Sequence, residues 1–167
     1  MTIEYWEGSL SKEEEKVIRH TNSELYVHFF PRKPGMSYAA IGDLVGDITI
    51  WLTSSEVQAF VNAAAIFSAF YGVYKKISNF AKKKKVIKAD SEIQIILQNQ
   101  NIIIQSDNIK ILRPESSDRM IEKNYLLLAL SVVANKDLPN DREVVISYDG
   151  EFHIETIDQY ASRKMKL

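Results

Sequence analysis

The chain has 167 residues, 46% hydrophobic and 26% charged, a composition typical of a globular protein that can bury a core. Its formal net charge of −1 gives no overall field that would favour nucleic acid or an anionic membrane. The absence of cysteine excludes disulfides, thiolate metal sites and thiol nucleophiles. Because the N-terminus also lacks a basic segment followed by an apolar run, we expect a cytoplasmic protein. Abundant lysine, isoleucine and asparagine suggest an AT-rich coding sequence of a bacterium or mobile element.

The first third of the chain predicts short strands around one polar helix. Ser11 and Glu14 have capping-box spacing and open a helix that runs to about residue 22. Pro31, followed closely by a second proline and a glycine, should end the strand before it. The strands are expected at residues 2–6, 25–30 and 48–52.

The longest predicted element is a central helix over about residues 54–82. Thr53 with Glu56, or Ser55 with Gln58, has the spacing of a capping box at its start. Its apolar residues cover a broad arc, which indicates burial against more than one neighbour. The aromatic residues of this arc are the candidate interface: Phe67, Phe70, Tyr71 and Tyr74.

A membrane-spanning alternative applies to the same helix. Residues 57–74 carry no charge and are flanked by lysines, which places them at the short limit for a spanning helix. Gln58, Asn62 and the many alanines argue against it, as does the polar sequence on both sides. We therefore favour a buried core helix and do not expect membrane association.

A basic patch follows the central helix. Between residues 56 and 90, seven lysines stand against two acidic residues, Glu56 and Asp90. Such a patch could contact nucleic-acid phosphates, but it lacks arginine and has few aromatic residues for stacking. A solvated helix end is the favoured interpretation, and nucleic-acid binding the alternative. The patch consists of Lys75, Lys76, Lys82, Lys83, Lys84, Lys85 and Lys88.

The second half predicts a hairpin, a third strand and a second helix. The alternating isoleucines predict a hairpin with its loop at Asn99-Gln100, pairing Leu97 with Ile102 and Ile95 with Ile104. A further strand is expected at residues 109–111, and Pro114 suits the start of a helix over about 115–134.

The last hairpin is expected to turn around Gly150 in a left-handed conformation, with a three-residue loop. We predict that Ile146 pairs with Phe152 and Val144 with Ile154. This pairing separates an apolar face from a second face, which carries Val145, Ser147, His153 and Glu155. His153 lies between Glu151 and Glu155, but surface residues of a strand explain this pattern better than a metal or acid–base site. Residues 158–167 are expected to be a polar tail.

Few residues suggest catalysis. Asp43 and Asp47, each after a glycine, could hold a divalent ion, although turn chemistry is the commoner reason for this pattern. No phosphate-binding glycine motif, zinc-binding histidine motif or serine elbow occurs, so we predict no cofactor.

The predicted fold class is α+β, with antiparallel hairpins or a mixed sheet packed on the central helix and the second helix. One domain over residues 1–167 is expected, with possible sub-halves 1–85 and 86–157. The apolar surface of residues 93–104, residues 125–134 and the central helix exceeds what one domain readily covers. We therefore predict a non-enzymatic protein-interaction module that self-associates.

Overall fold

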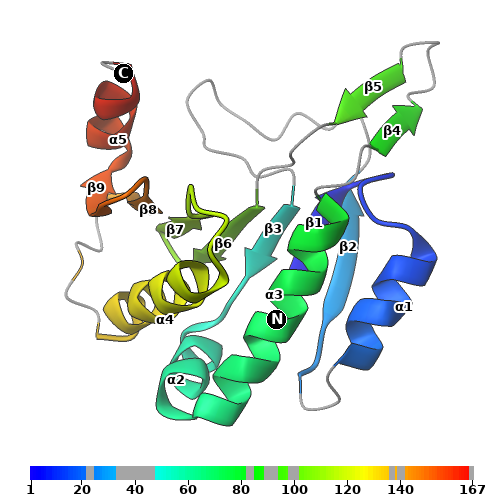
Figure 1. Ribbon diagram of the computed structural model, residues 1–167, viewed down its shortest axis with the longest axis horizontal. Helices are drawn as coiled ribbons and strands as arrows, with labels where there is room; N and C mark the ends of the chain where they lie inside the picture. Colours follow the sequence, from blue (N-terminus) through cyan, green and yellow to red (C-terminus); the bar gives the residue numbers. More distant parts are fainter. Residues whose placement is uncertain are drawn as a thin grey trace. The chain divides into compact units, whose positions relative to one another are not determined.

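The computed structural model describes residues 1–21, 25–32, 48–81, 85–88, 94–97, 102–135, 138 and 142–165, with 85–88 and 94–97 described as backbone. The expected α+β class is confirmed, because the described residues form five helices and a seven-stranded mixed sheet (Figure 1). The strand order of this sheet is β2-β1-β3-β6-β7-β8-β9, and β4 and β5 form a separate pair. The chain forms two compact units, which we call the first unit (Met1–Trp51 and Ser68–Ile103) and the second unit (Leu52–Phe67 and Ile104–Leu167). Both units interleave in sequence, unlike the contiguous halves 1–85 and 86–157.

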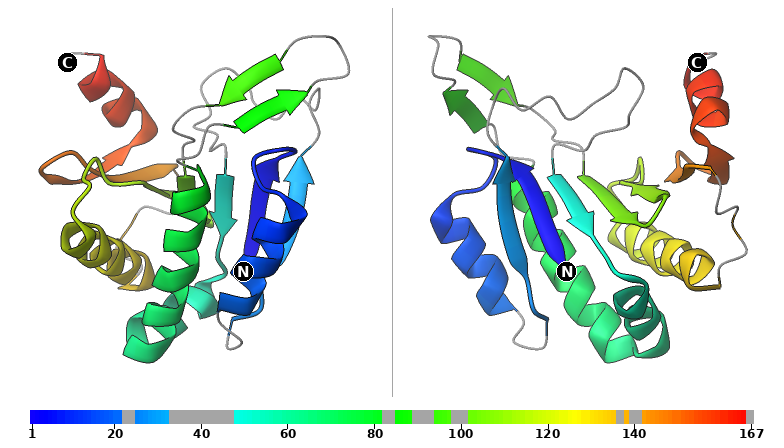
Figure 2. Two further views of the ribbon diagram at one scale, coloured as in Figure 1. Left: turned by 45° about the vertical axis from the view of Figure 1, so that its right-hand side comes forward. Right: turned by 180° about the vertical axis from the view of Figure 1, so that it is seen from behind.

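The first unit is built on a parallel crossover. β1 pairs in parallel with β2 and antiparallel with β3, and α1 connects the two parallel strands. The capping box predicted at Ser11 is present: Glu14 N donates to Ser11 Oγ over 3.2 Å, and Ser11 N donates to Glu14 Oε2 over 2.8 Å. Figure 1 shows α1 and α3 on one side of β1 and β2, and the strands lie in front of both helices when seen from behind (Figure 2). The elements are β1 (Thr2–Trp6), α1 (Lys12–Thr21), β2 (His28–Arg32), β3 (Ile48–Trp51), α3 (Ala64–Ala81, shared with the second unit), β4 (Lys85–Lys88) and β5 (Gln94–Leu97).

Two sequence predictions for this unit were wrong. Pro31 does not end its strand but lies inside β2, which tolerates it because β2 stands at one end of the strand order. The predicted pairing of Ile95 with Ile104 is also absent, since β5 pairs with β4 and places Ile95 opposite Ile87. The alternation of isoleucines was correct for strands, but it did not identify their partners.

The second unit places β7 and β8 in parallel, with α4 connecting them, and adds β9 by a hairpin. Tyr125 of α4 fixes this arrangement: its hydroxyl lies 2.9 Å from the carbonyl oxygens of both Leu112 and Ile146. Its ring also contacts Tyr148 and Phe152, so α4 covers that face of the hairpin. The elements are α2 (Ser54–Asn62), β6 (Ile102–Ser106, shared with the first unit), β7 (Ile109–Leu112), α4 (Arg119–Asn135), β8 (Val144–Tyr148), β9 (Phe152–Thr156) and α5 (Ile157–Lys164).

The predicted continuous helix over 54–82 is broken at Ala63. The Thr53–Glu56 capping box opens α2 as expected, but Ala63 is extended, with φ −131° and ψ 109°, and α3 begins at the next residue. The helix α2 packs against α4, where Gln58 Nε2 donates to the carbonyl oxygen of Ala134 over 2.7 Å (Figure 2). Neither glycine nor proline marks the break, so local propensity could not reveal it.

Helix lengths bear on the membrane alternative. Within the described ranges, no single helix is both long and apolar enough to cross a membrane. Only α2 and α3 taken together pass that test, and the two are bent by 115° at Ala63.

The second helix begins later than predicted. Pro114 does not start it; instead Asp118 Oδ1 accepts hydrogen bonds from Met120 N over 2.7 Å and Ile121 N over 3.2 Å, as an N-cap does. The helix α4 therefore runs from Arg119 to Asn135 rather than from 115 to 134.

The end of the chain differs from the predicted polar tail. Residues Ile157–Lys164 form α5, opened by a capping box between Thr156 and Gln159. The preceding hairpin has the predicted three-residue loop with Gly150 at φ +112°, but its pairs are shifted by two residues: Ile146 faces Ile154, and Tyr148 faces Phe152. Because a shift of two preserves the faces of a strand, Ser147 and His153 share one face as expected.

Candidate functional site

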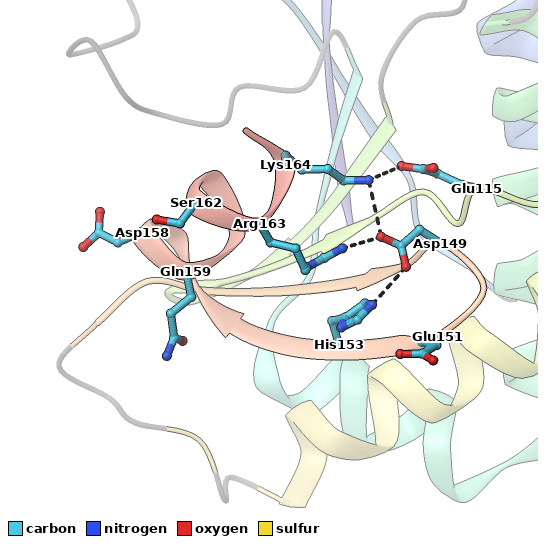
Figure 3. A pocket seen from close by; sticks show the side chains of 9 residues that line it. All are labelled: Glu115, Asp149, Glu151, His153, Asp158, Gln159, Ser162, Arg163 and Lys164. Carbon is cyan, nitrogen blue, oxygen red and sulfur yellow. Dashed lines mark hydrogen bonds and ion pairs between the residues drawn. The ribbon is translucent and has the colours of Figure 1, made fainter. Parts of the chain in front are cut away.

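A group of charged side chains in the second unit lies between α5 and the β8–β9 hairpin (Figure 3). The turn after β8 presents Asp149, and the register of the hairpin aligns Ser147 with His153 and Val145 with Glu155 on the face toward α5. The capping box of α5 then directs Arg163 and Lys164 back over that face. We call the following residues the Asp149 cluster: Asp149, His153, Glu155, Arg163 and Lys164.

Arg163 is the centre of this cluster. Its Nε donates to the carboxylate of Glu155 at 2.9 and 3.0 Å, and its Nη2 donates to Glu155 at 2.8 Å and to Ser147 Oγ at 2.9 Å. Its Nη1 donates to Asp149 Oδ2, a pair seen in Figure 3. One planar guanidinium thus ties α5 to β8, to β9 and to the turn between them.

The remaining contacts extend the cluster on both sides. Lys164 Nζ lies 2.7 Å from Glu115 Oε1 and 3.4 Å from Asp149 Oδ2. His153 Nε2 lies 2.9 Å from the other carboxylate oxygen of Asp149. Asp149 therefore accepts from three side chains, two of them on α5.

These contacts change the acidity of the cluster. Partial burial alone would raise the pKa of Asp149, but hydrogen bonds from Arg163 and His153 and the positive charge of Arg163 lower it from 3.8 to about 2. The pKa of Arg163 is raised, chiefly by its hydrogen bonds to Glu155, and that of Lys164 is raised chiefly by its bond to Glu115. All three groups are fully charged at neutral pH.

The chemistry open to this cluster is limited. All members of the cluster except Glu155 line an open hollow of about 910 Å³, but both cations, Arg163 and Lys164, already bind carboxylates. His153 and Asp149 form a pair that could move a proton, and among the described residues no hydroxyl is hydrogen-bonded to His153. Nowhere in the described residues do three or more His, Asp or Glu side chains gather to hold a metal ion. The cluster is therefore best explained as the attachment of α5, which has no buried residue of its own.

The basic patch predicted from sequence is divided between elements. Lys75 and Lys76 lie on α3, where Lys76 is exposed and Lys75 is half-buried, and Lys85 and Lys88 are the end residues of β4. Since α3 ends at Ala81, Lys85 and Lys88 belong to a strand and not to the helix end that was the favoured interpretation of the patch. The remaining lysines of the patch, Lys82, Lys83 and Lys84, lie outside the described residues, as do Asp43 and Asp47, the predicted metal ligands.

The aromatic residues predicted as an interface are all buried within the chain. Phe67, Phe70, Tyr71 and Tyr74 are each at most 4% exposed, and the rings of Tyr71 and Tyr74 stack with their centroids 6.3 Å apart. In this structure they contribute to the core and present no surface to a partner.

An exposed apolar surface occurs instead on α4. The side of this helix that faces the core carries Tyr125, Leu126, Ala129, Leu130 and Val133. The opposite side carries four large apolar side chains, which we call the α4 stripe: Met120 (66% exposed), Ile121 (38%), Leu127 (37%) and Leu128 (49%). The sequence contained a signal for it, because Met120 and Leu127, like Ile121 and Leu128, are seven residues apart and recur on one side of a helix.

A second exposed group, in the first unit, is less continuous. Tyr26, Phe30 and Trp51 are exposed, but the register of β1 and β2 places Glu4 beside Phe30. The Glu4 carboxylate also accepts a hydrogen bond from the Trp51 indole over 2.9 Å. A charged group thus interrupts this aromatic surface, whereas the α4 stripe contains none.

Comparison with known proteins adds no assignment. The chain matches no protein-family model, no curated protein and no solved structure.

Proposed function

We propose that this protein is a non-enzymatic protein-interaction module that binds its partner through the α4 stripe. One observation carries the proposal: α4 buries one apolar side in the core and exposes a second one, made of Met120, Ile121, Leu127 and Leu128. A helix that serves only its own core needs one apolar side, and a contiguous exposed patch is typical of a binding surface. The internally paired Asp149 cluster supports a non-enzymatic role, and the absence of cysteine supports a cytoplasmic setting.

Site-specific photocrosslinking tests this proposal. A photoactivatable benzoylphenylalanine replaces Leu128 in the cells that produce the protein, and the products are compared by mass with the 19.1 kDa monomer. We expect a discrete covalent adduct from position 128, because partner atoms should lie within van der Waals contact of that side chain. The matched control carries the same group at Asn62, an exposed helical residue of the second unit. Equal labelling from both positions, or none from position 128, would contradict the proposal.

Nucleic-acid binding through the basic patch is the second candidate, supported by the concentration of lysine between residues 75 and 88. If it is correct, changing Lys82, Lys83, Lys84 and Lys85 to glutamine should weaken binding and reduce the salt dependence of the affinity, with a slope change of about 0.9 per lost phosphate contact. Fluorescence anisotropy with labelled single- and double-stranded DNA measures both quantities. Equal affinity and slope in the two proteins would eliminate this candidate.

A further inference from the structure

We infer that the partner of α4 is a second copy of this chain, paired in the antiparallel direction with Asn124 at the two-fold axis. This inference rests on the proposed function and names the partner of the same surface.

The spacing of the α4 stripe is symmetric about Asn124. Met120 and Ile121 come four and three residues before it, and Leu127 and Leu128 come three and four residues after it. In an antiparallel pair with this residue on the axis, each position before it meets the equivalent position after it on the partner. Met120 then meets the partner's Leu128, and Ile121 meets the partner's Leu127. A two-fold interface needs such a self-complementary patch.

Asn124 itself is suited to the axis. Its side chain is exposed, and the structure shows no described residue hydrogen-bonded to its amide. A side-chain amide carries both donors and an acceptor, so two copies facing each other across the axis can satisfy one another. A single polar residue within an apolar seam also fixes the register of paired helices.

The charges of α4 favour the antiparallel direction. Its charged residues, Arg119, Glu122 and Lys123, all lie in the first half, and its last turn contains no basic residue. Antiparallel pairing brings the first half of each copy beside the uncharged second half of the other. It also sets the two helix dipoles in opposition, which places the positive end of each helix beside the negative end of its partner.

The area of the α4 stripe limits the affinity of the dimer. Specific, stable interfaces bury about 1,200 Å² or more in total, and a single helix side two turns long provides less than that. We therefore expect a weak dimer whose population depends on protein concentration. Changing Leu128 to Gln, which alters the interface twice, should raise the concentration of half-dimerisation on the order of tenfold in sedimentation velocity.

Engineered cysteines test the arrangement, because the natural chain contains none. Packed helices have axes about 8–10 Å apart, so residues facing each other on the axis lie within the Cα separation that a disulfide spans, about 4.4–6.8 Å. Under mild oxidation, Asn124→Cys should form a dimer visible on non-reducing gels. A mixture of Met120→Cys and Leu128→Cys should form the mixed dimer, whereas either alone should not. Asn62→Cys, at an exposed asparagine of α2, is the matched control.

Each outcome decides between the arrangements. No more dimer from Asn124→Cys than from Asn62→Cys overturns the inference. Dimer from Met120→Cys alone, without the mixed product, shows parallel helices and overturns the antiparallel arrangement. If the photocrosslink at position 128 captures a different protein and no second copy, the inference fails while the proposed function stands; if it captures nothing, both fail.

Discussion

Asp149 makes the C-terminal hairpin sensitive to acid. Its pKa is about 2 in the folded protein, below the ordinary value of 3.8. Because the folded value is the lower one, the ionised carboxylate stabilises the fold fully above about pH 4, and this contribution is lost as the pH falls towards 2. The loss corresponds to the release of Arg163, His153 and Lys164 from a common acceptor.

Changing Asp149 to Asn should therefore lower the free energy of unfolding at neutral pH by about 1 kcal/mol, allowing for solvent screening of a partly exposed pair. The difference between the two proteins should shrink as the pH is lowered towards 2. Urea unfolding between pH 2 and 7 measures it. Glu151→Gln is the control, since it makes the same chemical change in the same turn at an exposed side chain. A difference that stays constant with pH would contradict the assignment.

At the level of secondary structure, a single substitution can test whether the helix is broken between α2 and α3. The first hydrogen bond of α3 runs from Phe67 N to Ala63 O, so the N–H of Ala64 takes no part in the helical ladder. Ala63 also has the extended conformation that a residue before proline prefers. Ala64→Pro should therefore leave the free energy of unfolding unchanged or raise it by up to about 1 kcal/mol.

In a continuous helix the same substitution would cost about 3 kcal/mol or more. Thermal and urea unfolding of Ala64→Pro distinguish the two cases. Ala59→Pro, which lies inside α2, is the control and should show that full loss. A comparable loss at both positions would mean that the helix is not broken in solution.

Local signals predicted some elements well. The capping boxes at Ser11 and Thr53 were recognised because their partners lie three residues away. The hairpin around Gly150 was recognised because its turn residues and its two strands are neighbours in sequence, although its register was misjudged by two residues. The pairing of β5 with β4 and the break at Ala63 depend on packing between distant segments, which no local pattern contains.

In the candidate sites, too, local patterns predicted some features, whereas others depend on packing between distant segments. The shared face of Ser147, His153 and Glu155 followed from the two-residue period of a strand. Arg163, which binds two of these three residues, was missed because its role depends on the docking of α5 onto the hairpin. The aromatic residues of α3 were proposed as an interface because periodicity gives the apolar side of a helix without showing whether the same chain or a partner covers it, and in the structure the chain itself covers them.

At the scale of the whole molecule, the interleaving of the units has a practical consequence for any experiment. The chain passes between the units after Trp51, Phe67 and Ile103. A continuous fragment that contains one complete unit therefore always carries part of the other as well, and self-association is best measured on the full chain. The dimer predicted for α4 should appear there as an average mass that rises with concentration.

Pro31 limits what can attach to the sheet. His28 N donates to Met1 O, so alternate residues of β2 direct their N–H groups towards β1, while Phe29 and Pro31 point to the opposite edge. Proline has no N–H, so β2 offers an incoming strand the single outward donor of Phe29. A chain trying to extend the sheet at this edge would lose a hydrogen bond in the middle of its pairing, which opposes edge-to-edge aggregation.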